Sequence, residues 1–371
     1  MLKSEPTRSV IVFVPTLAFG GAERVALLLS SGFVELGHAC VIATCSTRGE
    51  FSDFVSPTVQ LVNLKCKKPI KGTRELSGLV NQVAPDSVIA FGMHTGIAAV
   101  ASKMRFGWRS QIIIRNENNL EADWNQADLL NRTIGPALSR WAARRSTVVA
   151  VSNALVKPTA SFLNIPEQDV FAIRNPVFDR TAKSLVQDNS LHPWLLERRS
   201  PTLVAAGRFE YQKGFDTLIR AFSLVSRELG ARLVIFGDGS LRSELQSLVD
   251  SLQLRDRVDL PGFTADPSAQ MRLATAFVLS SRFEGFGLVI VEALAAQTQV
   301  IATDCDYGPS ELLEHGRFGT LVPVDEEDTL ANAMTEAILG KTSPERPPPG
   351  WFEQFTAVQA AKQHLALIQK V

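Results

Sequence analysis

The chain alternates short apolar runs with longer stretches whose apolar positions repeat at helical spacing. Residues 10–14 (VIVFV) form the first run, and residues 22–36 follow it with a helical pattern. Buried strands alternating with helices are typical of parallel sheets covered on both faces. CVIAT, SVIAF, QIIIR, TVVAVS and VFAIRN continue the first series, and PTLVAAGR, RLVIFGDG, RVDLPGF, AFVLSS and QVIATD form a second. Two series predict two doubly wound α/β domains.

The length of 371 residues also exceeds what one ordinary core serves. The joint is expected within residues 175–201, which lack periodicity, and a proline run at 342–350 makes a second break. We therefore predict domains at residues 1–180 and 181–350, followed by an amphipathic helix at 351–371.

Composition narrows the class of protein. Lys plus Arg and Asp plus Glu both number 38, so no nucleic-acid partner is expected. The four cysteines lack metal-binding spacing and fit reduced thiols of a cytoplasmic protein. No apolar run reaches the roughly 18 residues of a spanning helix. Pro15 interrupts the N-terminal apolar run, which favours a buried strand at 10–14 over a signal peptide.

The second series carries the candidate chemistry in the turns that follow its strands. Arg208 comes directly after a strand, Lys213 lies five residues on, and SRFEGFG (281–287) opens a helix. In open α/β sheets, ligands bind at the carboxyl ends of strands. An arginine, a lysine and the N–H groups of a helix N-terminus together suit a diphosphate.

Two glutamates interrupt the apolar segment that follows. Glu284, ahead of the helix, could accept hydrogen bonds from sugar hydroxyls; a solvated loop charge is the alternative. Glu292 lies about two turns later, where it could reach the diol of a ribose; an exposed or capping carboxylate is the alternative.

Together these motifs resemble family-4 retaining glycosyltransferases. Glu284-x7-Glu292 with Gly-Phe-Gly inside, GRFEYQKGFDTLIRAF, GDGSLRSEL, LPGF and the N-terminal GGAER occur in the same order as in that family. The resemblance implies a GT-B fold, with two Rossmann-like domains facing across a cleft. The N-terminal domain would bind the acceptor, the C-terminal domain would bind a nucleotide-sugar donor, and the last helix would cross back to the N-terminal domain.

The resemblance also implies roles for individual residues. Arg208 and Lys213 would bind the pyrophosphate, Glu284 the sugar hydroxyls and Glu292 the ribose. The implied donor-binding set is Gly20, Gly21, Arg208, Lys213, Gly237, Phe263, Glu284, Gly285, Phe286, Gly287, Leu288 and Glu292. Glu284, His94, Arg208 and Lys213 are the expected catalytic residues.

The acceptor half offers weaker signals. His94 follows the strand SVIAF, where relatives often place a histidine near the transferred sugar; a capping or surface histidine is the alternative. Asn116 and Glu117 end another strand and are candidate acceptor-binding residues, or else a polar turn.

Three further features have competing interpretations. Asp304-x-Asp306 has the form of a metal motif, but its place before Gly308 favours turn chemistry, so neither metal nor cofactor is expected. Residues 65–74 hold five basic side chains, which form either a solvated loop or a surface for anionic lipid. SRWAARRS around Trp141 could lie at a membrane interface, but the family pattern favours a basic helix end.

The sequence therefore predicts a retaining, metal-independent hexosyltransferase that uses a nucleotide-diphospho-sugar. Glycoside hydrolases need a carboxylate pair flanking the bond, and this chain shows none so placed, so catalysis is expected to be mainly electrostatic. The resemblance favours a lipid-linked saccharide acceptor in polysaccharide or glycolipid assembly, at the inner membrane face. A nucleotide-sugar epimerase and an inactive sugar-nucleotide-binding subunit are the alternatives.

Overall fold

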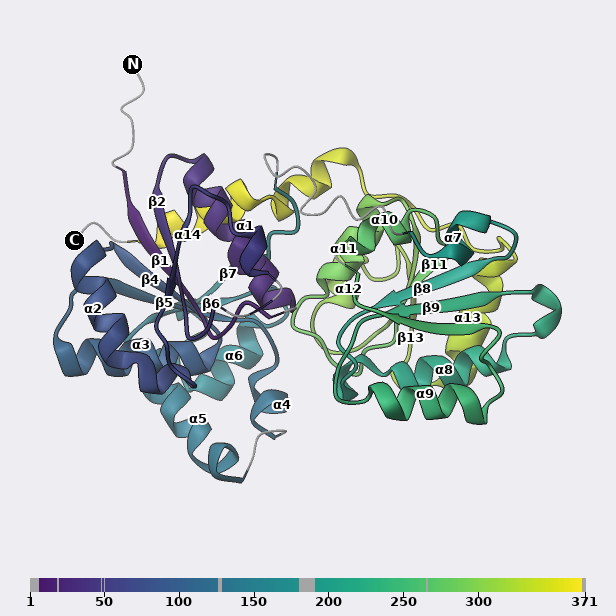
Figure 1. Ribbon diagram of the computed structural model, residues 1–371, viewed down its shortest axis with the longest axis horizontal. Coiled ribbons are helices and arrows are strands. Elements are labelled where there is room, and N and C mark those ends of the chain that lie inside the picture. Colours follow the sequence, from purple (N-terminus) through teal and green to yellow (C-terminus); the bar gives the residue numbers. More distant parts are fainter. Residues whose placement is uncertain are drawn as a thin grey trace, which may run out of the picture. The chain divides into compact units, whose positions relative to one another are not determined.

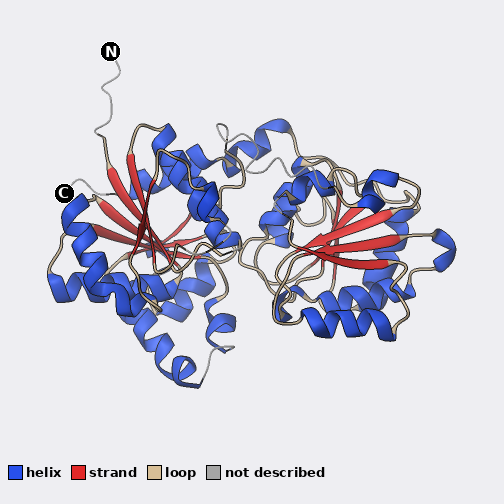
Figure 2. Cartoon of the chain, in the orientation of Figure 1, coloured by secondary structure: helices blue, strands red, loops and turns tan. Residues whose placement is uncertain are grey.

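The computed structural model describes residues 7–18, 20–47, 49, 51–125, 129–179, 191–264 and 266–368. The chain forms two compact units. Unit 1 comprises Met1–Thr181 and Glu353–Val371, and unit 2 comprises Ala182–Phe352. The expected boundary at 180 and 181 lies outside the described residues. Both units are α/β, with strands at the centre and helices outside (Figure 2).

The sheet of unit 1 has seven parallel strands in the order β3-β2-β1-β4-β5-β6-β7. Its central strands are buried on both faces, which explains their continuous apolar runs. The strands are β1 (Ser9–Val14), β2 (Ala39–Thr44), β3 (Gln60–Asn63), β4 (Ser87–Phe91), β5 (Gln111–Asn116), β6 (Thr147–Ala150) and β7 (Val170–Ala172).

Helices cover both faces of this sheet (Figure 1). One face carries α1 (Gly21–Glu35) and α14 (Ala357–Leu367), which pack together. A side chain at Gly32 of α1 would come within 2.3 Å of the Ala357 carbonyl oxygen, so glycine permits this close approach. The other face carries α2 (Thr73–Val83), α3 (Met93–Phe106), α5 (Leu129–Ala143) and α6 (Val156–Leu163), with the short α4 (Leu120–Asn125) beside α5.

The C-terminal segment differs from the single helix expected at 351–371. It forms a 3₁₀ helix, η6 (Pro349–Phe355), and then α14. Thr356 separates them because its hydroxyl caps α14, accepting a hydrogen bond from the Gln359 N–H at 3.3 Å. Residues 369–371 lie outside the described residues.

Unit 2 contains six parallel strands in the order β10-β9-β8-β11-β12-β13. The order reverses between β8 and β11, the place where doubly wound sheets bind ligands. The strands are β8 (Thr202–Ala206), β9 (Arg232–Phe236), β10 (Val258–Gly262), β11 (Ala276–Leu279), β12 (Gln299–Thr303) and β13 (Thr320–Val322).

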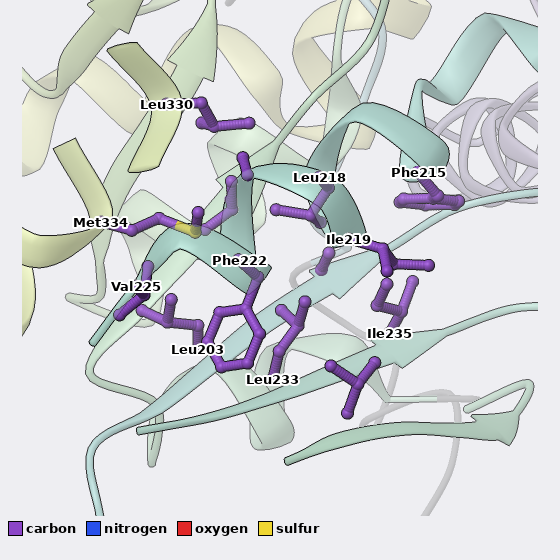
Figure 3. Packing of buried hydrophobic residues seen from close by; sticks show 14 of the residues in the cluster. Leu203, Phe215, Leu218, Ile219, Phe222, Val225, Leu233, Ile235, Leu330 and Met334 are labelled. Carbon is purple, nitrogen blue, oxygen red and sulfur yellow. The ribbon is translucent and has the colours of Figure 1, made fainter. Parts of the chain in front are cut away.

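One face of this second sheet carries the main core. Phe215, Leu218 and Phe222 of α8 pack onto Leu203 and neighbouring strand residues (Figure 3). Met334, on the next helix over this face, completes the cluster. This face bears α8 (Phe215–Leu224), α9 (Arg242–Ser251) and α13 (Glu327–Ile338). The opposite face bears α10 (Pro267–Met271), α11 (Leu288–Ala295) and α12 (Pro309–Leu312). The short helix α7 (Pro193–Glu197) precedes β8.

The strands expected from apolar runs are all present, and two more occur. β3 and β13 are the edge strands of their sheets, and the sequence pattern did not predict them. Each is short and only partly buried, so it needs no continuous apolar run. Among the described residues, no helix is long and apolar enough to cross a membrane.

Candidate active site

The loops after β8 and β9 support each other at the carboxyl edge of the unit 2 sheet. The Phe209 N–H donates to the Asp238 carbonyl at 2.8 Å. A side chain at Gly237 would come within 1.8 Å of the Gly207 carbonyl oxygen, so only glycine allows this contact. Arg208 lies between these anchors and is exposed. The predicted GDGS motif thus supports the loop that presents Arg208.

A second loop brings Lys213 to the end of β11. Lys213 ends a 3₁₀ turn, η4 (Tyr211–Lys213), and Gly214 follows with a φ of 58°. A side chain at Gly214 would come within 2.2 Å of the Ser280 carbonyl oxygen. The Ser280 hydroxyl in turn donates to the Lys213 carbonyl at 2.8 Å. Glycine at position 214 is therefore required by the contact between the two loops.

Lys213 and Glu284 form an ion pair there. The Lys213 Nζ lies 2.5 Å from the Glu284 Oε1, and the Ser281 hydroxyl donates to the same oxygen at 2.6 Å. The side chains of Lys213 and Glu284 are only 17% and 7% exposed. The alternative of a solvated loop charge at Glu284 is therefore wrong. Screening by water is weak at such a site, so the charges act strongly on nearby groups.

The turn after β12 contacts and supports the loop that carries Glu284. The Glu284 N–H donates to the Asp306 carbonyl at 3.3 Å. A side chain at Gly308 would come within 2.2 Å of the Phe286 carbonyl oxygen. Burial and the charge of Glu284 raise the pKa of the Cys305 thiol to about 12.

Among the described residues, no group of three or more His, Cys, Asp or Glu side chains is arranged to hold a metal ion.

Helix α11 begins where this loop ends. Gly287 precedes the helix with a φ of 89°, and Leu288 is its first residue. The first N–H groups of a helix have no partner within it and attract anions. Glu292 lies four residues on and is 1% exposed, so the alternative of an exposed carboxylate is wrong. Phe263, after β10, is 43% exposed.

Arg282 is a supporting residue that the sequence analysis missed. Its guanidinium bonds Asp216 at 2.8 Å and Asp325 at 3.0 Å, and lies 4.3 Å from the Tyr211 ring centre. Burial alone would raise the pKa of Asp216, but the bonds from Arg282 outweigh it and lower that pKa. Arg282 thereby ties the turn carrying Lys213 to the loop carrying Glu284. Its place in SRFEGFG was the available signal.

The predicted residues of unit 1 lie at the carboxyl edge of their own sheet. Gly20 is extended and precedes α1, and Gly21 is the exposed first residue of α1. His94 is exposed in the first turn of α3, with its ring 4.9 Å from that of Trp124. Burial against its neighbours, helped by the charge of Lys68, lowers the pKa of His94. The lowered pKa of His94 favours the neutral imidazole at pH 7.

The two acceptor candidates at the end of β5 are engaged inside unit 1. Asn116 is 1% exposed and its amide donates to the Thr159 hydroxyl at 2.8 Å. Glu117 accepts from the Arg115 Nε at 2.8 Å. Arg115, which the sequence analysis did not single out, is fully buried and also bonds Asn175 and His364.

Comparison with known proteins identifies the family. The model for glycosyl transferases group 1 matches residues 187–347, and the model for glycosyltransferase family 4 matches residues 19–179. The two matches are consecutive and together span most of both units.

One similar curated protein comes from Campylobacter jejuni. It is N-acetylgalactosamine-N,N'-diacetylbacillosaminyl-diphospho-undecaprenol 4-alpha-N-acetylgalactosaminyltransferase. It is 25% identical over 337 residues, which cover 87% of this chain and 88% of the relative. N-acetyl-alpha-D-glucosaminyl L-malate synthase of Bacillus anthracis is 25% identical over 232 residues, covering 61% of this chain and 60% of that one.

Solved structures agree on the fold. HepE of Anabaena, solved with UDP and glucose, matches with a TM-score of 0.79 at 19% identity, covering 97% of this chain and 99% of HepE. WaaG, a glycosyltransferase involved in lipopolysaccharide biosynthesis, matches with a TM-score of 0.71 at 17% identity, covering 95% of each chain. The chain has the GT-B fold and belongs to the group 1, family 4 glycosyltransferases.

Proposed function

We propose that this glycosyltransferase is a retaining hexosyltransferase that moves a sugar from a nucleotide-diphospho-sugar to a lipid-linked saccharide. Unit 2 binds the donor and unit 1 binds the acceptor. The observation that carries the proposal is the nearly buried Lys213–Glu284 pair beside the N-terminus of α11. Such a site offers a fixed cation, helix N–H groups and a carboxylate within one loop cluster.

The donor would use each of these groups differently. Arg208, Lys213 and the first N–H groups of α11 take the diphosphate. Glu284 accepts hydrogen bonds from sugar hydroxyls through Oε2, because Lys213 and Ser281 both donate to Oε1. The ammonium of Lys213 has three N–H donors, so it can bind Glu284 and a phosphate oxygen together. Glu292 takes the ribose.

Electrostatic stabilisation would then be the main catalytic device. Charge develops on the leaving diphosphate, and Arg208 with Lys213 stabilises it without reorganisation. The departing phosphate oxygen takes the proton of the acceptor hydroxyl on the same face of the sugar, which retains the anomeric configuration. Neutral His94 can exchange hydrogen bonds with a sugar hydroxyl. No metal ion takes part.

The relatives support a choice of donor and acceptor for testing. The name of the Campylobacter relative specifies a diphospho-undecaprenol-linked saccharide as its acceptor. HepE was solved with UDP and glucose. We therefore infer a UDP-sugar donor and a polyprenyl-diphosphate-linked acceptor for this chain.

An acceptor of that kind resides in a lipid leaflet, so the protein would work at the inner face of the membrane. The basic loop between β3 and α2 supports this placement. Each basic side chain near anionic lipid contributes about 1 kcal/mol, enough together for reversible docking. The loop carries the exposed residues Lys65, Lys67, Lys68 and Lys71, and the exposed Arg74 follows in the first turn of α2.

Incubation with a donor labelled in its sugar tests the proposal. We expect the label to appear in the lipid fraction, also in the presence of EDTA. NMR of the product should show that the α-configuration of the donor is preserved. A free epimer of the donor would instead identify an epimerase. Binding without turnover, across UDP-, GDP- and TDP-sugars and lipid acceptors, would identify an inactive binding subunit.

A further inference from the structure

Trp124 is a buried aromatic side chain of α4 to which the proposed function gives no role. It is 5% exposed, and its ring lies against Gly135 of α5, where an added Cβ would meet the ring at 2.3 Å. Asn119 holds the start of α4, because its side-chain oxygen accepts from the N–H groups of Glu121 and Ala122 at 3.0 and 3.3 Å. These contacts fix the place of the indole in unit 1.

The indole N–H of Trp124 does not account for this placement. Among the described residues it has no hydrogen-bond partner. A buried tryptophan N–H usually has one, as in Trp108, whose Nε1 donates to the Ser102 hydroxyl at 3.1 Å. A phenylalanine at position 124 would offer an aromatic surface without burying an unpaired donor. We conclude that unit 1 uses the surface of the Trp124 ring rather than its N–H.

That ring contacts the imidazole of His94. The two ring centres lie 4.9 Å apart with an interplanar angle of 67°, an edge-to-face arrangement. His94 lies in the first turn of α3, which the next residue ties to the end of β4. The Thr95 hydroxyl lies 2.7 Å from the Phe91 carbonyl oxygen and 2.9 Å from that of Gly92. The backbone of His94 is thereby fixed, so its remaining freedom is that of the side-chain torsions, which the Trp124 ring restricts.

Charged groups on the neighbouring elements do not hold the imidazole. Burial, and then the charge of Lys68 in the loop between β3 and α2, lowers the pKa of His94, so Lys68 disfavours the imidazolium. On α4, Asp123 accepts from the Asn118 amide at 2.9 Å. After β5, Glu117 accepts from the Arg115 guanidinium. Within the part of the chain that the structure describes, no group bonds the His94 ring nitrogens.

We propose that Trp124 is the positioning residue of His94, and that its buried ring holds the imidazole in one orientation with the nitrogens free for a sugar hydroxyl. This inference rests on the proposed role of His94 in transfer and identifies the residue that sets its geometry. A side chain that is already oriented loses less conformational freedom when the substrate binds. Trp124 acts only through His94.

Histidine NMR tests this placement without donor or acceptor. The chain has five histidines, so the His94 Cε1–H signal can be assigned by its loss in His94→Gln. In the wild type, the ring current of Trp124 should displace this signal. Trp124→Leu should abolish the displacement and raise the pKa of His94 toward its ordinary range, because water gains access to the imidazole. Trp124→Phe should keep a displacement of the same sign.

A double-mutant cycle tests the consequence for transfer. Trp124→Leu should lower the transfer rate by about tenfold, the value of a hydrogen bond that is no longer well aligned, while the affinity for UDP stays unchanged. In a His94→Gln background, Trp124→Leu should have no further effect, since it acts through His94. Trp124→Phe should retain most of the transfer rate.

Trp108→Leu is the matched control for the loss of a buried tryptophan. Trp108 is 6% exposed, follows the C-terminal end of α3 and contacts Lys103. Its replacement should lower the melting temperature, because it removes a buried ring and a hydrogen bond. The His94 signal and the transfer rate should stay at the wild-type values when both are measured well below the melting temperatures of the variants.

Three results would overturn the inference. These are a His94 signal that Trp124→Leu leaves unchanged, an equal loss of transfer by Trp124→Leu with and without His94, and a loss of transfer in Trp124→Phe despite a normal His94 signal. The last result would assign the indole N–H to a substrate. A wild type that transfers no sugar to a lipid-linked acceptor, while the histidine signals respond as expected, would instead reject the proposed function and support the placement of His94 by Trp124.

Discussion

Both units bury an ionic cluster at the carboxyl ends of their strands, but the two clusters are assembled differently. In unit 1, Arg115 of β5 bonds Glu117 in the next loop, Asn175 after β7 and His364 on α14. In unit 2, Lys213 and Glu284 come from two loops that are already in contact.

Their surroundings differ as well. Arg115 is fully buried, and its guanidinium lies 5.1 Å from the centre of the Phe91 ring. Lys213 keeps 17% of its side chain exposed, next to the N-terminus of α11. The groups around Arg115 come from four segments of the chain and fill its surroundings. Such a buried ion holds those segments together. A partly open pair beside helix N–H groups is instead suited to a ligand.

The largest expected effect is on the stability of unit 1. Arg115→Met leaves Glu117 and Asn175 without their partner and should lower the free energy of unfolding by about 3–5 kcal/mol. Chemical denaturation measures this, with Arg115→Lys as a milder variant if the first does not fold. Arg227→Met, which breaks an exposed pair with Asp256, is the control and should cost less than about 1 kcal/mol. Similar losses in Arg115→Met and Arg227→Met would contradict a structural role for Arg115.

Lys213→Met should show the opposite pattern. Transfer should fall by about 10²–10³-fold, because a preorganised group that stabilises the leaving charge is lost. The unfolding free energy should fall less than in Arg115→Met, since Ser281 still bonds Glu284. Steady-state kinetics and denaturation on the same preparations measure both. A variant that loses stability but keeps its transfer rate would make this pair structural too.

Two glycines with the same backbone conformation sharpen the contrast within unit 2. Gly214 and Gly230 have φ values of 58° and 59°, but only Gly214 has backbone atoms within reach of a new side chain. Gly230→Ala should cost about 1–2 kcal/mol of stability and spare donor binding. Gly214→Ala should cost more and weaken donor binding, because it separates Lys213 from Ser280. Equal donor affinity in the two variants, measured by calorimetry, would show that the loop contact does not shape the site.

The last effect is confined to acid conditions and concerns the cluster of unit 1. Burial, helped by the charge of Arg115, lowers the pKa of His364 to about 3. Below its ordinary pKa near 6.5, the unfolded chain therefore binds a proton that the folded chain excludes. The unfolding free energy should fall by up to about 1.4 kcal/mol per pH unit as the pH drops from 6.5 toward 3.

His364→Gln should flatten that slope between pH 6 and 4.5, whereas replacing the exposed His315 by Gln should leave it unchanged. Denaturation curves across this range provide the measurement. An unaltered slope in His364→Gln would mean that other groups set the acid sensitivity.

The residues differ in how far the sequence could predict them. Arg208, Lys213 and Glu284 lie in the loops that follow β8 and β11, so strand order alone brings them to one edge. Arg115 could not be found this way, because its partners lie 60 and 249 residues away in the chain. The edge strands β3 and β13 are short and only partly buried, so they carry no continuous apolar run that would reveal them.

Calorimetric binding of a nucleoside diphosphate tests the central claim most directly, that Lys213 and Glu284 form a donor site with divided roles. The wild type, Lys213→Met, Glu284→Gln and Glu292→Ala would be compared at constant ionic strength. We predict that Lys213→Met and Glu292→Ala each lower the affinity for the nucleoside diphosphate by about tenfold or more, the value of a lost charged hydrogen bond. Glu284→Gln should leave that affinity nearly intact while reducing transfer. Equal effects of Glu284→Gln and Glu292→Ala on the affinity, or no effect of Lys213→Met, would contradict the account.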